Sequence, residues 1–449
     1  MAWNRKSAVV AAGIVGMAVV ILVWVGLRAG PSSLELAPIP AACALLDEST
    51  LAASQRPPPT QADYDHTLAV LERNIAAGGT MFINEAATRR LQRFQALRDV
   101  DDLQRAEELT TQQLEANTGD PAARARRAAI RIARHDFTGA LDDAQASGAV
   151  VLEVDALEEL GRFDEARARL AQLPEAGMSA LLRHARAADN AGESERAATL
   201  LDAAIQEARY TSLPSTALAG LLAQRGTLAL HNGDFSGACA AYTEALNLHP
   251  GQISTLEWLG RWAWHAGQPM LAWRFVQRAA ELDPQNAGLQ QLLVEIADDA
   301  RMRESAPDIA AVVTQARQAV GQLTQRWPDW YRLMQAENLA SAGEVARAQA
   351  LVAEERERRQ GREWLAAAVH VHTESGDFAA AEGALQALQN NGVLHPPVLY
   401  RAWRYYRARG MSEAAEAAAV ALAEGRIELS PDEWRNLASA QSLTVAASE

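Results

Sequence analysis

Two patterns of apolar and polar residues divide the chain. The first is an uninterrupted apolar run, Ala8–Leu27, that contains no charged side chain. As a helix with a rise of about 1.5 Å per residue, this run spans about 30 Å, the thickness of the hydrocarbon core of a bilayer. From about residue 60 onward, apolar residues instead recur every three or four positions, which is the spacing of amphipathic helices. We therefore predict one transmembrane helix followed by a helical body.

The charges around the apolar run predict its orientation. Arg5 and Lys6 precede the run, whereas Arg28 is the only basic residue after it until Arg56. Because basic residues favour the cytoplasmic side, we expect a single-pass protein of the inner (cytoplasmic) membrane with its N-terminus in the cytoplasm and its body outside. A cleaved signal peptide is the alternative, although the apolar region of such a peptide is usually only about 7–15 residues long.

Prolines separate the apolar run from the helical body. Pro31, Pro38, Pro40 and the run 57–59 preclude a continuous helix and favour extended backbone. Thr60, followed three positions later by an aspartate, is typical of a helix N-cap. We accordingly divide the chain into a signal-anchor helix (1–28), a proline-rich linker (29–59), a helical N-terminal cap (60–98), a repeat array (99–425) and a C-terminal capping helix with a tail (426–449).

The helical body repeats itself internally. When residues 219–252 are aligned with 253–286, five small residues or prolines recur at a spacing of 34. Each block has the pattern of two amphipathic helices that are joined by a glycine turn and end in Leu-x-Pro. The matched pairs are Gly226/Gly260, Gly233/Gly267, Ala238/Ala272, Ala245/Ala279 and Pro250/Pro284.

These blocks resemble the tetratricopeptide repeat family. The resemblance implies an all-α fold, a right-handed α-solenoid of helix hairpins whose stacked repeats share one core and form a concave groove. With the apolar run, the predicted architecture is this solenoid preceded by one N-terminal transmembrane helix. The family's glycines, aromatic pair, alanines and proline are matched by Gly226, Gly233, Phe235, Ala238, Tyr242, Ala245 and Pro250.

Weaker copies of the turn motif extend the array on both sides. Phe137 and Leu103 occupy equivalent positions 34 residues apart but lack the turn glycine. Between Gly267 and Gly343 no turn motif appears, and Pro307 is expected to interrupt the helices there. The glycines of the weaker copies are Gly161, Gly192, Gly343, Gly376 and Gly410.

The resemblance also implies where a ligand binds. In tetratricopeptide repeats, ligand contacts come mostly from the first helix of each hairpin, on the face that lines the groove. Arginines with aromatic neighbours on that face are typical of binding hot spots and predict a protein partner with an acidic or carboxylate-bearing segment. Solvated helix faces are the alternative. The matching residues are Arg186, Asn190, His231, Glu257, Arg261, Trp264, His265, His370, Tyr400, Arg404 and Arg407, and Thr227 and Glu363 lie at equivalent positions.

Composition narrows the range of partners. The formal net charge is −14, which argues against nucleic acid as a partner. Lys6 is the only lysine, so a lysine-dependent clamp for chaperone tails is not expected. The two cysteines, Cys43 and Cys239, are too few for a disulfide framework or a four-cysteine zinc site. Cys239 is expected as a small packed side chain, and a Cys43–Cys239 bridge in an oxidising compartment is left open.

Motifs of catalysis are missing from the sequence. It contains no P-loop, no Gly-x-Ser-x-Gly and no His-Glu-x-x-His pattern, so we expect neither an enzyme nor a cofactor. His370 and His372 point about 200° apart on a helix and cannot share a metal ion. The charge run 354–359 is expected as a solvated helix face, and the aromatic cluster 327–331 as a structural staple at a helix start.

Two functions fit these patterns. The first is a membrane-anchored scaffold or adaptor that recruits protein partners for an envelope assembly or secretion process. The alternative is a regulatory accessory subunit of a membrane enzyme, such as an exopolysaccharide synthase or export complex, held partly through the transmembrane helix. Both follow from the family resemblance, because a repeat array is a generic platform for binding.

Overall fold

The computed structural model describes residues 35–36, 43–54, 61–97, 100–211, 213–299, 302, 307–441 and 444–445. The regular structure of these residues is helical, except that β1 (Glu35–Leu36) pairs in parallel with β2 (Thr444–Val445). The predicted membrane helix, Ala8–Leu27, lies outside the described residues. Among the helices that are described, none combines the length and the apolar character needed to cross a bilayer.

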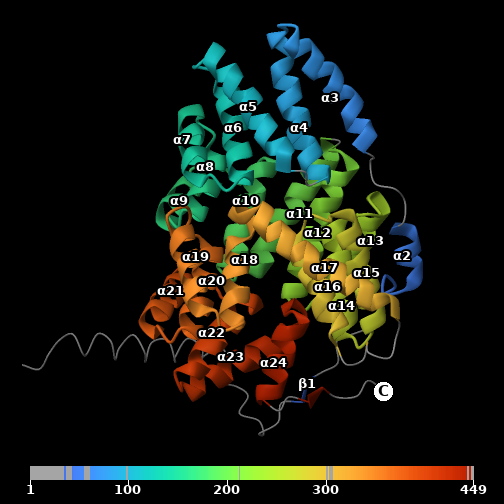
Figure 1. The fold of residues 1–449 in the computed structure, drawn as a ribbon, viewed down its shortest axis with the longest axis vertical. Coiled ribbons are helices and arrows are strands. Elements are labelled where there is room, and N and C mark those ends of the chain that lie inside the picture. Colours follow the sequence, from blue (N-terminus) through green and yellow to red (C-terminus); the bar gives the residue numbers. More distant parts are fainter. Residues whose placement is uncertain are drawn as a thin grey trace, which may run out of the picture.

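The helices form a series of hairpins in which each helix packs against the next one along the chain (Figure 1). The series is preceded by α3 (Gln61–Ala76) and η1 (Thr80–Phe82) and followed by η3 (Arg426–Glu428) and α24 (Pro431–Gln441). Pro307, expected to interrupt the helices, begins one of them. The hairpins are α4 (Ile83–Leu97) with α5 (Val100–Ala116), α6 (Pro121–Ala133) with α7 (Phe137–Ser147), α8 (Val150–Glu159) with α9 (Phe163–Leu170), α10 (Met178–Asn190) with α11 (Ser194–Tyr210), α12 (Ser215–His231) with α13 (Phe235–Leu248), α14 (Ile253–His265) with α15 (Pro269–Leu282), α16 (Ala287–Ala297) with α17 (Pro307–Arg326), α18 (Pro328–Ser341) with α19 (Val345–Arg356), α20 (Arg362–Glu374) with α21 (Phe378–Asn390), and α22 (Pro396–Ala408) with α23 (Ser412–Glu424).

The hairpin turns confirm the repeat that the sequence predicts. The turn glycines adopt the left-handed conformation, which glycine tolerates because it lacks a Cβ atom. In the hairpin of α6 and α7, where the sequence has no glycine, His135 takes the equivalent place with a φ of +60°. The φ angles are +75° at Gly161, +77° at Gly192, +71° at Gly233, +80° at Gly267, +82° at Gly343, +73° at Gly376 and +69° at Gly410.

Small residues inside the hairpins allow the helices to approach closely. A Cβ atom on Gly226 of α12 would lie 2.4 Å from the ring of Tyr242, which is fully buried on α13. In the next hairpin, a Cβ atom on Gly260 would lie 2.5 Å from a methyl group of Val276. The two glycines that the alignment matched therefore serve the same packing role in successive repeats.

A helix occupies part of the segment that was expected to be an extended linker. Residues Glu48–Ser54 form α2, which packs against α15. Leu46 and Leu51 are buried in the same core cluster as Trp262 and Phe275. Extended backbone is thus the wrong prediction for 48–54, because apolar residues there gain more by packing against the array than they lose by ordering.

The array does not extend as one elongated solenoid but folds back on itself. We call residues 61–326 the first arm and residues 328–441 the second arm. In Figure 1 the second arm, orange to red, lies against α8–α10 and α14 of the first arm. Backbone contacts join the arms, since the Gln360 N–H donates to the carbonyl oxygen of Glu159 at 3.0 Å. The ring of Trp330 also packs against Phe94, with ring centroids 5.5 Å apart, and stacks on His135 at 5.8 Å.

The charge run 354–359 is not the solvated face that the sequence predicted. Glu355 is fully buried and accepts hydrogen bonds from Arg332 at 2.6 Å and from Arg359 at 2.8 Å. Arg359 is also buried, whereas Glu354 remains exposed. The prediction fails because the run lies where the second arm meets the first, so that part of it turns inward.

Candidate functional site

The residues predicted to line the groove lie on the first helices of the hairpins, and most of them lie where the two arms face each other. On the first arm they come from α10, α12 and α14, and on the second arm from α20 and α22. We call the surface between the arms the inner seam. The first-arm residues are Arg186, Asn190, His231, Glu257, Arg261, Trp264 and His265, and the second-arm residues are His370, Tyr400, Arg404 and Arg407.

The central part of the inner seam is covered by the chain itself. Arg261 donates to the carbonyl oxygen of Glu428 at 3.4 Å and to the carboxylate of Glu257 at 3.2 Å. The ring of His265 lies 3.2 Å from the carbonyl oxygen of Leu429. These first-arm side chains therefore contact η3 and the residue after it, where a ligand was expected.

The other arginines predicted to receive an acidic partner are engaged within the chain. Arg186 pairs with Asp155 at 2.8 Å and with a second carboxylate, that of Glu158, at 2.6 Å. Arg404 pairs with Glu374 at 2.8 Å and donates to the ring of His370 at 3.2 Å. Their positive charge is largely balanced by neighbouring carboxylates, so the inner seam is poorly suited to a second acidic ligand.

The aromatic residues of the predicted set belong to the core or flank it. Trp264 is buried and donates from its indole N–H to Asp299 at 2.9 Å. Tyr400 is also buried, and its ring lies against Trp403 with centroids 5.4 Å apart. The guanidinium of Arg407 stacks over the ring of the same Trp403 at 5.0 Å.

The inner seam brings together four titratable groups, three of which sequence reasoning missed. Nδ1 of His231 lies 3.8 Å from Oδ2 of Asp189, and Nε2 lies 3.4 Å from Oε2 of Glu428. Nε2 of His395 lies 3.8 Å from the same Asp189 oxygen. Burial lowers the pKa of His231 to about 4 and raises the pKa of Glu428 to about 8. No spacing in the sequence marks these residues, because they come from four separate segments.

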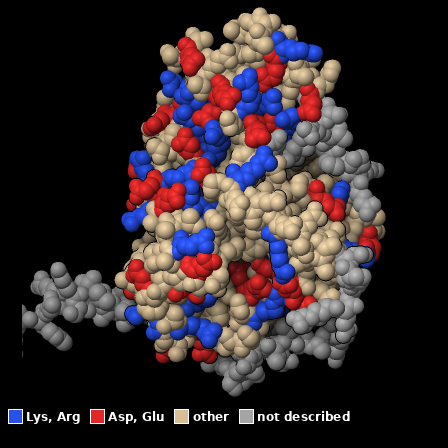
Figure 2. Space-filling model, viewed as in Figure 1, with Lys and Arg blue, Asp and Glu red and all other residues tan. Residues whose placement is uncertain are grey.

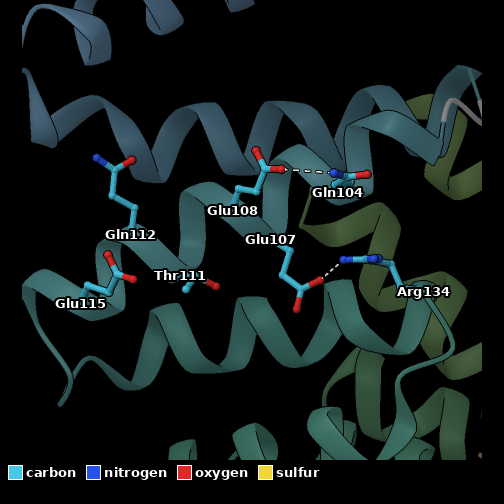
Figure 3. Close-up of a pocket in the computed structure, with 7 residues that line it drawn as sticks. All are labelled: Gln104, Glu107, Glu108, Thr111, Gln112, Glu115 and Arg134. Carbon is cyan, nitrogen blue, oxygen red and sulfur yellow. Dashed lines mark hydrogen bonds and ion pairs between the residues drawn. The ribbon is translucent and has the colours of Figure 1, made fainter.

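A separate groove lies on the first arm, away from the inner seam. It has a volume of about 570 Å³ and follows one face of α5, with Arg134 from the end of α6 on its wall (Figure 3). Glu107 pairs with Arg131 at 2.9 Å and with Arg134, whereas Glu115 is exposed at the other end. The groove therefore has a polar and partly acidic lining, made up of Gln104, Glu107, Glu108, Thr111, Gln112, Glu115 and Arg134.

Charges of both signs are mixed on the visible face of the first arm (Figure 2). On the face drawn in Figure 2, acidic and basic side chains alternate over its upper part. Many of them are paired, as Arg127 is with the buried Asp143 at 2.7 Å and Arg105 with Glu72 at 2.6 Å. A surface with interspersed charges of both signs stays soluble and does not preferentially attract ligands of one charge.

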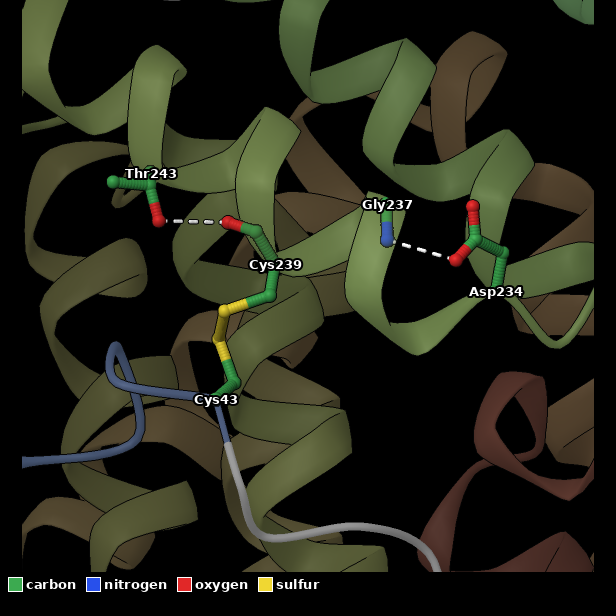
Figure 4. The surroundings of a disulfide bond; sticks show 5 residues. All are labelled: Cys43, Asp234, Gly237, Cys239 and Thr243. Atoms are coloured by element: carbon green, nitrogen blue, oxygen red, sulfur yellow. Dashed lines mark hydrogen bonds between the residues drawn. A yellow bond between two sulfur atoms is a disulfide. The ribbon is translucent and has the colours of Figure 1, made fainter.

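A disulfide bond between Cys43 and Cys239 joins the start of the described body to α13 (Figure 4). The two Cα atoms are 5.7 Å apart. On the same side of the array, Arg278 of α15 donates to the carbonyl oxygen of Ser54 at 2.7 Å. The bridge that the sequence left open is thus formed, and the expectation of Cys239 as an unbridged packed side chain is wrong. Residues 43–54 are fastened to the array at both ends.

Comparisons with solved structures find matches of low sequence identity that span much of the chain. No protein-family model matches the chain, and no curated protein matches it. A tetratricopeptide repeat protein from Parabacteroides merdae is 14% identical and has a TM-score of 0.30, with 59% of this chain and 98% of that one covered. Yeast Tom70 is 14% identical with a TM-score of 0.30, and the match covers 88% and 96% of the two chains. The Cut9–Hcn1 hetero-tetramer of the APC/C is 13% identical with a TM-score of 0.32, and the match covers 88% and 92%.

The repeat geometry decides the class of fold. Two successive hairpins repeat at a spacing of 34 residues, their turn glycines are left-handed, and Gly226 packs under Tyr242. The fold is tetratricopeptide-like. In this tetratricopeptide-like protein, the face that would form an open concave groove is instead occupied by the second arm.

Proposed function

We propose that this protein is a membrane-anchored scaffold that holds a protein partner outside the cytoplasm for an envelope assembly or secretion process. The observation that carries the proposal is the Cys43–Cys239 disulfide, which fastens the segment after the apolar run to the repeat array. Stable disulfides belong to oxidising compartments such as the bacterial periplasm.

The anchor and its orientation are part of the same proposal. The apolar run Ala8–Leu27 is long enough to cross a bilayer, and Arg5 and Lys6 favour a cytoplasmic N-terminus. With this orientation, Cys43 follows the membrane closely on the outer side. The disulfide then holds the array next to the membrane surface, which suits a scaffold that works with other membrane or envelope proteins.

We place the partner on the α5 groove. Three arginines of the inner seam, Arg186, Arg261 and Arg404, are paired with carboxylates of the chain, so an acidic segment has little to gain there. The α5 groove, in contrast, exposes Gln112 and Glu115 on one face of a helix. A polar or basic segment of a partner protein fits this lining by charge.

The orientation can be tested by protease protection in spheroplasts. We expect added protease to degrade the body of the protein while a cytoplasmic marker stays intact. Protection of the body until the cells are lysed would contradict the extracytoplasmic placement.

The binding surface can be tested by photo-crosslinking in the same cells. A photoreactive residue in place of Gln112 should form a crosslink to a partner protein, and the same residue in place of Tyr210, which is 91% exposed on α11, serves as the control. We expect the crosslink at position 112 to weaken when Glu115 is changed to Arg. Equal crosslinking from both positions, or none from position 112, would overturn the α5 groove as the partner site.

A further inference from the structure

We propose that Asp189, His231 and His395 bind a Zn²⁺ ion that joins the two arms across the inner seam. Asp189 is near the end of α10 and His231 is the last residue of α12, both on the first arm. His395 precedes α22 on the second arm. An ion held by all three residues would connect parts of the chain that are distant in sequence.

The geometry of the three side chains fits one ion. One ligand atom from each residue lies within 4.8 Å of the other two. Both His231 Nδ1 and His395 Nε2 are 3.8 Å from Oδ2 of Asp189. Ligands at about 2.1 Å in a tetrahedral arrangement are about 3.4 Å apart. The two histidine–aspartate separations therefore need to shorten by about 0.4 Å, and the two histidine nitrogens need to approach each other by at most about 1.4 Å.

The two histidine nitrogens that face Asp189 have no hydrogen-bond partner among the residues that the structure describes. His231 Nδ1 and His395 Nε2 are both buried from solvent, and at 3.8 Å the Asp189 carboxylate is too far to accept a hydrogen bond from either. Buried polar atoms without a partner are costly. A bound metal ion would satisfy both nitrogens at once.

Glu428 contacts the ring nitrogen of His231 that does not face Asp189. Its carboxylate is almost fully buried and lies 3.4 Å from Nε2 of His231, on the side of the ring away from Asp189. A carboxylate that contacts the second nitrogen of a ligating histidine is the usual arrangement around zinc, because it fixes the orientation of the ring. Glu428 is therefore a positioning residue in this proposal and not a ligand.

The backbone holds His395 in place before any ion binds. The Val393 N–H donates to the carbonyl oxygen of Asn190 at 2.7 Å, which sets the loop before α22 against the end of α10. Arg362 donates to the carbonyl oxygens of Asn391 at 2.8 Å and Val393 at 2.7 Å. The ligands from the two arms are thus already assembled.

The donor set and the surrounding charges favour a divalent ion with nitrogen and oxygen ligands. Two imidazoles and one carboxylate leave a position for water in a four-coordinate zinc site. Of the charged groups nearby, Arg362 is occupied by the two carbonyl oxygens and Arg261 contacts the carbonyl oxygen of Glu428. The carboxylate of Asp189 remains to balance the charge of the ion.

Zinc binding can be measured directly on the full-length protein purified in detergent. After treatment with a chelator and equilibration with Zn²⁺, elemental analysis should find one ion per chain. The variants His231→Ala and His395→Ala should each retain less than a tenth of that amount. His249→Ala, a half-buried histidine at the end of α13, is the matched control and should still bind one ion.

Two further variants separate loss of the site from loss of the fold. Asp189→Asn keeps the shape of the side chain, and it should lose the ion while its far-ultraviolet circular dichroism stays that of the wild type. Glu428→Gln should weaken zinc binding by about 10–100-fold without abolishing it. The proposal is overturned if the wild type binds no zinc, or if the histidine variants bind as much as the wild type.

Discussion

The backbone N–H of Val393 donates a 2.7 Å hydrogen bond to the carbonyl oxygen of Asn190. This bond fixes the loop before α22 of the second arm on the end of α10 of the first. With the contacts of Arg261 to η3 and of His265 to the residue after η3, it closes the face that tetratricopeptide-like arrays otherwise leave concave. The protein's own second arm is therefore the occupant of the inner seam.

The buried carboxylate of Glu355 should be the critical member of the charge run. Glu355→Ala leaves Arg332 and Arg359 buried without their shared partner, which should cost about 3–5 kcal/mol of stability. Glu354→Ala is the matched control, because Glu354 is exposed and its ion pair with Arg332 is worth at most about 1 kcal/mol. Urea unfolding of the two variants measures the difference, and equal losses would refute the buried network.

A methyl group at Gly226 should be harmful, although alanine is the better helix former. Gly226→Ala drives a Cβ atom to 2.4 Å from the Tyr242 ring, and overpacking of this kind costs about 1–3 kcal/mol. Gly321→Ala on α17 meets no atom within 4 Å and should stabilise the protein by up to about 1 kcal/mol. Thermal unfolding should therefore shift in opposite directions for the two variants, and a shift in the same direction would count against the close packing.

His370 should make the protein sensitive to acid. Burial lowers the pKa of its imidazole to about 4, with a smaller contribution in the same direction from the charge of Arg404 that the carboxylate of Glu337 opposes. Below about pH 6.5 the unfolded chain binds a proton at this histidine that the folded chain does not bind. The free energy of unfolding is therefore at its full value above about pH 6.5 and decreases as the pH falls toward 4. His370→Gln should reduce this loss by on the order of 2–3 kcal/mol.

The pH dependence is measured by urea unfolding at pH 7 and at pH 4.5 for both proteins. His372→Gln, on the same helix but only half-buried, is the control and should change the pH dependence less. If His370→Gln loses as much stability between the two pH values as the wild type, then His370 is not the group that titrates.

The disulfide should stabilise the attachment of residues 43–54. Cys43→Ser removes a cross-link that closes a long loop, and losses of about 2–4 kcal/mol are typical of such bridges. A reducing agent should lower the melting temperature of the wild type to that of the variant and leave the variant unchanged. A variant that melts at the same temperature as the oxidised wild type would show that the bridge does not contribute.

Local pattern predicted the hairpins well. The seven turn glycines expected from the sequence all have positive φ, since a left-handed turn strongly selects glycine. The positions of Gly226 and Tyr242 matched the repeat pattern because closely packed helices require residues of a given size at a fixed spacing. The turn before Phe137 is the exception, because His135 adopts the left-handed conformation there in place of a glycine.

The packing of the second arm against the first has no such pattern in the sequence. Its contacts use backbone groups, such as those of Val393 and Asn190, which any residue provides. Glu355 looks like its exposed neighbours in the charge run, and only the tertiary structure distinguishes it. Asp189, His231 and His395 come from three segments, so the cluster that they form appears only once the arms are assembled.

The state of the two cysteines in intact cells tests the account most directly. Cells are quenched in acid, free thiols are alkylated, and the protein is then compared with and without prior reduction. We predict that Cys43 and Cys239 are both protected from alkylation until a reducing agent is added, as expected for an array held outside the cytoplasm. Full alkylation of both cysteines without reduction would contradict the disulfide and, with it, the placement of the scaffold.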